Sequence, residues 1–284
     1  MANSQNPVIT FSSDDPEMEQ AAAKARKTFR YFWRELSWEH RRIVPGLQLA
    51  AVKGYFTDPE SRPDAFDGEH MWLVDVQFDG REIYGTLINS PRTIQSVKEG
   101  DRVRIPGKRL TDWMYVQDGE EVFGGFTIDL MRSRMSDAER KQHDKAWGLD
   151  FGKVGIVNLV PPSYIGEATT KKRGLFGPFG KPSQEQQDYA KVAEAEHPMS
   201  VNMRGSLDQQ LSTSPDFLSG ADDFGMTLLH QLCLAGSLDG VDVCLSHGAD
   251  VTQATANGLT PLALATSLGW SRVVKRLQAA GATK

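Results

Sequence analysis

Hydrophobic positions change their spacing twice along the chain. Between Asp15 and Trp38 they recur every three or four residues, which predicts an amphipathic helix whose apolar stripe covers a sheet. Asp15 suits the N-cap of this helix and Pro16 suits its first position. The stripe consists of Met18, Ala21, Ala22, Ala25, Phe29, Phe32 and Leu36.

From residue 47 to residue 123 short apolar runs are separated by turn residues, which predicts a series of strands. The turn pairs Asp79-Gly80 and Asp118-Gly119 each predict a hairpin. The predicted strands are 47–56, 71–78, 83–88, 102–105, 113–116 and 121–123. In the second of them, alternation predicts one common face for Trp72, Val74, Val76 and Phe78.

Helical spacing returns after these strands. Ser136 and Glu139 match a capping box that begins a helix ending near Trp147, and the apolar run 156–160 predicts a short strand. The fold class expected for residues 16–160 is therefore α+β, with an antiparallel sheet and packing helices. Residues 1–15 are expected to be disordered, and 161–196 to form a linker with a polar helix over 184–196.

The last third of the chain repeats with a period of 33 residues. Thr260-Pro261-Leu262 and Thr227-Leu228-Leu229-His230 each resemble part of the Thr-Pro-Leu-His motif of the ankyrin family. The resemblance implies an all-α ankyrin-repeat domain over 197–284. Two repeats, 223–254 and 256–284, are clear, and 197–222 is either a degenerate repeat or an N-terminal cap, because about three repeats are needed for stability. The matched positions are Gly225/Gly258, Thr227/Thr260, Leu229/Leu262, Gly236/Gly269, Gly248/Gly281 and Ala249/Ala282.

Residues 69–135 contain several short motifs that resemble one bacterial family, the YegJ-like domain. The resemblance covers roughly the first 150 residues, counting the N-terminal helix. Because the function of that family is uncharacterised, the resemblance implies a fold and a bacterial origin but no reaction. The motifs are Glu69-His70-x-Trp72, the run 85–91, Gly100-Asp101-x-Val103, Asp112-Trp113-Met114-Tyr115 and Gly124-Gly125-Phe126-Thr127.

Composition and charge narrow the class of protein. The 284 residues are 39% hydrophobic and 24% charged, with a formal net charge of -5. An acidic balance argues against a dedicated nucleic-acid binder, and no apolar run is long enough to span a membrane. The N-terminus lacks the basic start and apolar segment of a secretory signal. With Cys233 and Cys244 as the only cysteines, we expect a cytoplasmic protein without a disulfide framework.

One set of side chains in the first repeat has the spacing of zinc ligands. His230-x-x-Cys233 and Cys244-x-x-His247 form a mirror-symmetric set. In an ankyrin frame, however, His230 belongs to the turn, both cysteines fall on inner helix faces, and His247 lies at a helix end. We favour this structural interpretation and expect no metal site and no cofactor.

The motif region also offers candidates for chemistry, which we weigh against structural roles. His70, Asp112 and Tyr115 are able to serve as acid-base groups, but nothing in the sequence shows that they meet. Gly124 and Gly125 before a helix are able to form a backbone nest for an anion, although paired glycines more often mark a tight turn. These five residues are the candidate site, and no catalytic motif is present.

These observations favour a non-catalytic bacterial protein that binds another protein. The ankyrin repeats would present the binding surface, and the partner could be a toxin or effector that the protein neutralises or regulates, as an immunity protein does. The alternative is an enzyme or small-ligand protein with a site near His70, Asp112 and Gly124-Gly125. The sequence leaves the oligomeric state open.

Overall fold

The computed structural model describes residues 15–58, 68–117, 119–165 and 191–283. Two compact units divide the chain, Met1–Leu159 and Val160–Lys284. Apart from Asp15, the stretch predicted to be disordered lies outside the described residues. Most of the predicted linker and polar helix over 161–196 does so too, although residues 191–194 are helical. Among the described residues, no helix is both long and apolar enough to cross a membrane.

A six-stranded antiparallel sheet forms the centre of the first unit, in the order β4-β3-β2-β1-β5-β6. Its edge strand β4 approaches β1 across the curled sheet. A Cβ atom on Gly54 would lie 2.5 Å from Ile105 Cδ1, so a larger residue at this position would require the Ile105 side chain to shift. The strands are β1 Leu47–Thr57, β2 Gly68–Phe78, β3 Glu82–Leu87, β4 Arg102–Pro106, β5 Leu110–Gln117 and β6 Val122–Gly124, with a 3-10 turn at Gly107–Arg109. The predicted fold class is confirmed.

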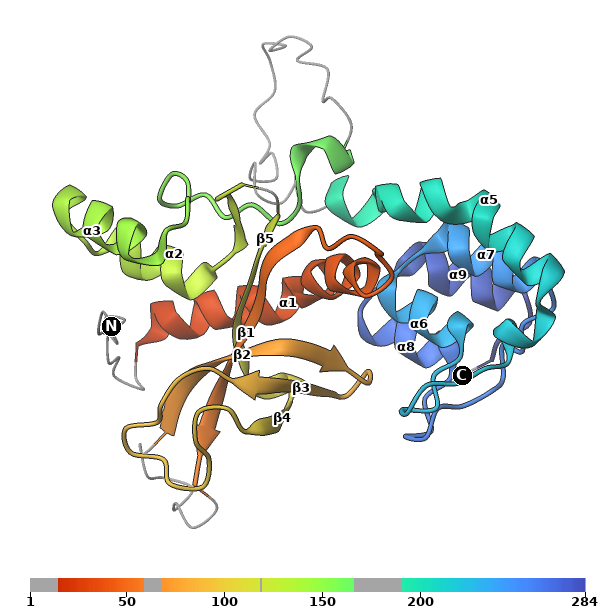
Figure 1. The fold of residues 1–284 in the computed structure, drawn as a ribbon, viewed down its shortest axis with the longest axis horizontal. Coiled ribbons are helices and arrows are strands. Elements are labelled where there is room, and N and C mark those ends of the chain that lie inside the picture. The colour runs from red at the N-terminus through yellow and green to blue at the C-terminus, as the bar shows by residue number, and fades with distance from the viewer. Residues whose placement is uncertain (1–14, 59–67, 118, 166–190, 284) are drawn as a thin grey trace, which may run out of the picture. The chain divides into compact units, whose positions relative to one another are not determined.

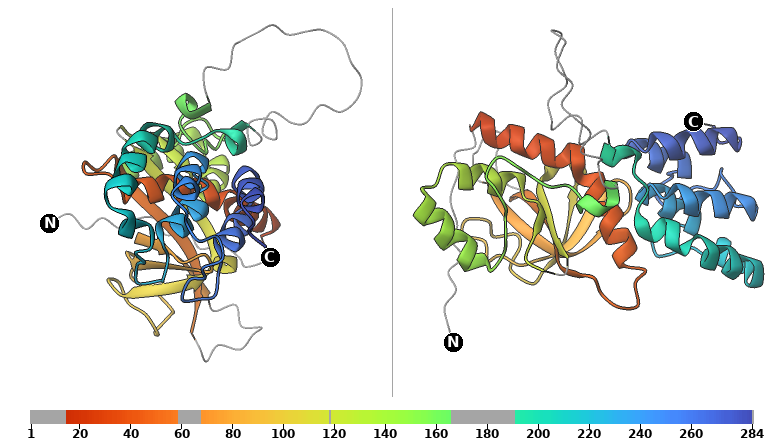
Figure 2. Two further views of the ribbon diagram at one scale, coloured as in Figure 1. Left: turned by 90° about the vertical axis from the view of Figure 1, so that its right-hand side faces the viewer. Right: turned by 90° about the horizontal axis from the view of Figure 1, so that it is seen from above.

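Helix α1, Pro16–Glu39, covers one face of this sheet (Figure 2). It begins as predicted, because the Asp15 carboxylate accepts hydrogen bonds from the backbone N–H groups of Glu17 and Met18. Trp113 of β5 ties the helix to the sheet. Its ring packs 5.9 Å from the Phe32 ring, centroid to centroid, and its Nε1 donates to the Ala25 carbonyl at 2.9 Å. The buried indole therefore has a polar partner as well as apolar contacts.

The opposite face of β1, β2 and β5 packs against the segment that follows β6. Helices α2, Phe126–Ser133, and α3, Asp137–Trp147, belong to this segment. The predicted capping box at the start of α3 is present, with Ser136 as N-cap. The buried cluster on this face consists of Ala51, Trp72, Met114, Val116, Val122, Ile128 and Phe151.

A β-bulge in β2 corrects one prediction about sheet faces. Asp75 has φ 50°, and the register with β3 shifts between Val74 and Gln77. The extra residue reverses the alternation, because a slip of one residue turns every later side chain to the other face. Trp72 accordingly joins the cluster on the α2 side, whereas the Phe78 ring packs 5.3 Å from Phe29 of α1.

The strand predicted over 156–160 is wrong. These residues have no regular secondary structure, although the Asn158 carbonyl accepts one hydrogen bond from the Gly124 N–H at 2.8 Å. The apolar run is explained by burial instead of strand pairing, because Leu159 is packed into the core. A short apolar run bounded by prolines does not distinguish these two cases.

In its described part, the second unit is all-α. A 3-10 turn, Pro162–Ile165, lies at the start of its described part. Two helix pairs then form the predicted repeats, with Thr227 and Thr260 as the N-caps of their first helices. The segment before them is one continuous helix instead of a helix-turn-helix pair. The elements are α5 Pro198–Thr213, a 3-10 turn Pro215–Leu218, α6 Leu228–Ala235, α7 Leu238–Ser246, α8 Pro261–Ser267 and α9 Ser271–Ala279.

Candidate functional site

Three polar and aromatic side chains, two of them from the motifs, lie side by side across three neighbouring strands of the sheet. In the strand register, Lys53 of β1 lies between Trp72 of β2 and Asp112 of β5. Direct cross-strand neighbours point to the same face of a sheet, so the three side chains meet there. The row lies on the face that packs against α2.

Asp112 holds the start of α2. Its carboxylate accepts hydrogen bonds from Phe126 N at 3.0 Å, from Thr127 N at 2.8 Å and from Thr127 Oγ1 at 2.5 Å. Gly125 makes this geometry accessible, because it caps the helix with φ 78° in the left-handed region. A carboxylate suits the first N–H groups of a helix, where the helix dipole is positive.

Lys53 also contacts the start of α2. Its Nζ donates to Thr127 Oγ1 at 2.8 Å and lies 4.8 Å from the centroid of the Trp72 ring. Burial lowers the pKa of Lys53, and the Asp112 charge opposes that shift. Burial likewise raises the pKa of Asp112, whereas the Lys53 ammonium and the hydrogen bonds from Thr127 and Trp113 oppose it. Lys53 and Asp112 are therefore buried together and joined through the Thr127 hydroxyl, which accepts from Lys53 and donates to Asp112.

The other predicted acid-base residues do not join Asp112. The Tyr115 hydroxyl donates to the Leu159 carbonyl at 3.1 Å, and its ring stacks between Trp113 and Phe123 on the α1 side. Residues three apart in a strand face opposite ways, so parity alone separates Tyr115 from Asp112. His70 Nδ1 lies 3.1 Å from Thr111 Oγ1.

Gly124 and Gly125 form a turn whose N–H groups are already used. Gly124 N donates to the Asn158 carbonyl and Gly125 N to the Trp113 carbonyl, both at 2.8 Å. The next N–H groups, those of Phe126 and Thr127, donate to Asp112. The position predicted for an external anion is thus occupied by the protein's own carboxylate.

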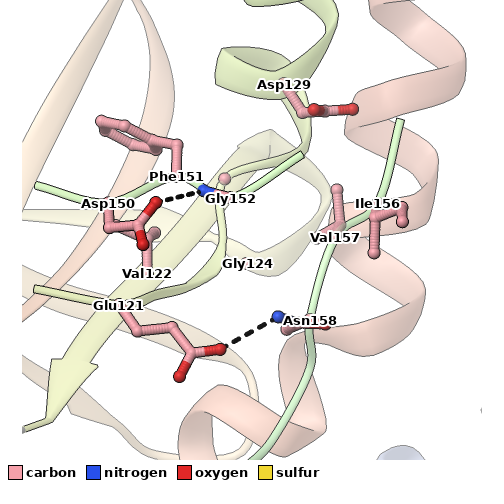
Figure 3. A pocket seen from close by; sticks show the side chains of 11 residues that line it. Glu121, Val122, Gly124, Asp129, Asp150, Phe151, Gly152, Ile156, Val157 and Asn158 are labelled. Carbon is pink, nitrogen blue, oxygen red and sulfur yellow. Dashed lines mark hydrogen bonds between the residues drawn. The ribbon is translucent and has the colours of Figure 1, made fainter. Parts of the chain in front are cut away.

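The same glycines line one side of a cavity of about 120 Å³ (Figure 3). Carboxylates surround it, but each is hydrogen-bonded within the chain. Asp150 Oδ1 accepts from Gly152 N at 2.8 Å, and Glu121 Oε1 accepts from Asn158 Nδ2 at 3.1 Å. Neither His70, Asp112 nor Tyr115 contributes to its lining. The candidate residues therefore do not converge on one pocket.

The motif carboxylate of Glu69 also has structural partners. Glu69 Oε1 accepts hydrogen bonds from the backbone N–H groups of Arg92 at 2.9 Å, Thr93 at 2.5 Å and Ile94 at 3.0 Å. Burial raises the pKa of Glu69, but these hydrogen bonds outweigh it and lower the pKa overall. Glu69 thus binds the backbone of residues 92–94 in the loop between β3 and β4.

The four zinc-like residues have separate environments in the second unit. His230 Nδ1 lies 2.7 Å from Thr227 Oγ1, and its Nε2 lies 2.9 Å from the Gln253 carbonyl oxygen. Cys233 and Cys244 are buried free thiols, and His247 Nε2 lies 2.8 Å from Asp208 Oδ1. Among the described ranges, no three His, Cys, Asp or Glu side chains are arranged to hold a metal ion.

Sequence reasoning missed Lys53 and Thr127. Lys53 is the one basic residue in an otherwise apolar and neutral strand run, and Thr127 ends a motif. A charged residue in such a run signals a buried partner. The identity of that partner depends on strand register, which pairs residues 59 positions apart.

Two protein families match separate parts of the chain. The model of a family described as "Uncharacterized protein conserved in bacteria (DUF2314)" matches residues 15–151, and an ankyrin repeat model matches residues 224–253. A Neisseria meningitidis serogroup B protein, named as an ankyrin repeat protein (NMB1133/NMB1171), is 39% identical over 267 residues, or 94% of each chain. The chain belongs to the DUF2314 family.

A second relative matches over a shorter stretch. The uncharacterized protein YegJ of Escherichia coli K12 is 36% identical over 61 residues, which cover 22% of this chain and 39% of that protein. The resemblance of residues 69–135 to the YegJ-like domain, and that of the tail to ankyrin repeats, are both confirmed. Because ankyrin repeats are protein-binding modules, the DUF2314 chain carries a unit suited to protein–protein interaction.

Proposed function

We propose that this DUF2314 protein is a non-catalytic cytoplasmic protein that binds a partner protein and restrains it, in the way an immunity protein neutralises a toxin. We assign partner binding to residues 197–284, and assign to residues 16–160 the surface that distinguishes the family. Residues 161–196 connect the two.

One observation carries this proposal: the loops that precede α6 and α8 are held together as a fixed surface. His230 of α6 bonds to the Gln253 carbonyl in the second loop, and Ala256 N donates to the Phe224 carbonyl in the first at 3.0 Å. A surface fixed before binding loses little conformational entropy when a partner docks. The polar groups around Asp112, by contrast, are already hydrogen-bonded to one another within the chain.

Affinity capture of the tagged full-length protein from its native host tests the proposal. We expect one protein to be recovered in stoichiometric amount, and its expression alone to slow growth that co-expression of this chain restores. Recovery of no stoichiometric protein contradicts partner binding. Recovery of a partner whose activity is unchanged in the complex contradicts restraint.

A small-ligand function is the second candidate, and the cavity beside Gly124 and Gly125 is the observation that favours it. Its carboxylates suit a small cationic ligand. A thermal-shift screen of small amines and ammonium compounds would show stabilisation that disappears in Asp150→Asn. A flat response throughout the screen would remove this alternative.

A further inference from the structure

Negative charge is concentrated in the repeat unit. Residues 205–271 contain no Lys and no Arg, while the whole chain has a net charge of only -5. All the acidic residues of this stretch are aspartates. They are Asp208, Asp216, Asp222, Asp223, Asp239, Asp242 and Asp250.

The structure separates these aspartates into two groups. Those on the helices are paired: Asp208 with His247, Asp239 with Arg204, and Asp242 with Arg276. Those in the loops, Asp216, Asp222, Asp223 and Asp250, form no ion pair with a Lys or Arg in the described part of the chain. Among the described residues, the aspartates of this stretch that form no ion pair at all are therefore those of the loops.

These loops project from the same side of the repeat unit (Figure 1). We call residues 216–224 and 250–257 the finger face. Burial lowers the pKa of His230, and the charges of both Asp222 and Asp250 oppose that shift. The backbones of the two loops are also joined, because Ala256 N donates to the Phe224 carbonyl at 3.0 Å, so the loops form one surface.

Two of the finger-face carboxylates are fixed in position. Asp222 Oδ1 accepts from Phe224 N at 3.0 Å and from Met226 N at 2.9 Å, and Asp250 Oδ1 accepts from Thr252 N at 2.8 Å. Loops held in this way keep their charges in place before a partner arrives. Charges that need no reorganisation bind their counterions at lower cost.

An aromatic ring lies within the same charged loop. Phe217 is 46% exposed, beside Asp216 in the turn Pro215–Leu218. An exposed ring next to a carboxylate favours arginine over lysine, because a guanidinium can stack on the ring while it donates to the carboxylate. Phe217 is an observation separate from the charge, and it also indicates an arginine.

We propose that the finger face docks an arginine-rich segment of the protein partner, with one guanidinium over Phe217 and the other cations against Asp216, Asp222, Asp223 and Asp250. This inference rests on the proposed function, because it names the surface and the chemistry of the partner. The negative charge of the face opposes nucleic acid and anionic lipid.

The test uses full-length protein and labelled probe peptides of alternating arginine and leucine, with lysine-leucine and glutamate-leucine peptides for comparison. Asp216→Lys/Asp223→Lys reverses two exposed charges whose side chains make no internal hydrogen bond or ion pair among the described residues. Glu120→Lys/Glu194→Lys changes the net charge equally at exposed positions outside the finger face. Fluorescence anisotropy gives Kd at low and physiological salt.

We expect the finger-face variant to bind the arginine probe about 10-fold or more weakly than the wild type, with a smaller dependence of Kd on salt. The Kd of the control variant should stay within about 2-fold of the wild-type value. Phe217→Ser should weaken binding of the arginine probe about 2- to 5-fold, and binding of the lysine probe by less. Equal losses in the two charge variants, or no binding of the arginine probe by the wild type, overturn the proposal.

Capture from the native host separates this inference from the proposed function. If the wild type and the Asp216→Lys/Asp223→Lys variant retain the same partner equally, partner binding stands and the finger-face proposal is wrong. If the variant alone loses the partner, both are supported. If the wild type captures no stoichiometric partner, the proposed function itself fails.

Discussion

Asp112 of β5 accepts a hydrogen bond from the backbone N–H of Thr127 at 2.8 Å, so a carboxylate of the sheet occupies the anion-binding end of α2. Lys53 sits beside them with its Nζ on Thr127 Oγ1. The most distinctive motif residues of the family therefore stabilise a helix start. Their density in the sequence reflects a buried hydrogen-bonded network and a tight turn, and it does not require a reaction.

Replacing Asp112 with asparagine tests this assignment. The amide cannot accept every hydrogen bond that the carboxylate accepts, and Lys53 loses its neighbouring anion. We expect the free energy of unfolding to fall by about 3–5 kcal/mol, the usual cost of removing one partner of a buried pair. Denaturant unfolding measures the loss.

The double variant Lys53→Met/Asp112→Asn serves as the control for that prediction. Because neither charge is then left without its partner, we expect it to recover part of the lost stability. An Asp112→Asn protein as stable as the wild type would show that the pair does not hold α2.

Stability in acid should depend on Asp15. Hydrogen bonds from Arg134 lower the pKa of Asp15 to about 2. A depressed pKa contributes stability above the unfolded value, near 4, and this contribution is lost as the pH falls through about 2. Unfolding midpoints measured from pH 5 to pH 2 should therefore fall more steeply in the wild type than in Asp15→Asn. Parallel pH curves for the two proteins would contradict the assignment.

Gly236 and Gly248 provide a matched pair in the repeats. Both have positive φ, 71° and 81°, but only Gly236 is crowded, because a Cβ atom added there would lie 2.3 Å from Trp270 Cδ2. We expect Gly248→Ala to cost about 1–2 kcal/mol, the usual cost of a left-handed alanine. Gly236→Ala should cost more, because Trp270 must also move. Thermal unfolding measures both, and equal losses would show that Trp270 does not pack closely on Gly236.

His230 and His247 should differ in importance although both belong to the zinc-like set. His230→Ala removes contacts to Thr227 and the Gln253 carbonyl inside the unit, and we expect a loss of about 2–4 kcal/mol. His247→Ala removes a contact to the exposed Asp208, worth about 1 kcal/mol or less. Denaturant curves with and without a chelator provide the measurement. A zinc site would make both variants and the chelator equally damaging.

Much of the fold was predictable because its signals are local. Turn pairs such as Asp79-Gly80 and the cap at Asp15 act within a few residues, and the period of 33 residues marks the repeats. The bulge at Asp75 was not predictable, since it depends on pairing with a distant strand. The segment 156–160 was mistaken for a strand because burial and pairing leave the same apolar signature.

The candidate site likewise has features that the sequence predicts and features that only the structure shows. Parity places Asp112 and Tyr115 on opposite faces once β5 is known to begin at Leu110, whereas the strand predicted over 113–116 left Asp112 out. The residue order also carries the family motifs and the lack of Lys and Arg from residue 205 to residue 271. The folded chain was needed to show that Asp112 meets Lys53 and Thr127, and that the unpaired aspartates gather on the loops. Register and packing bring together residues that are far apart in the chain, and no local propensity encodes those distances.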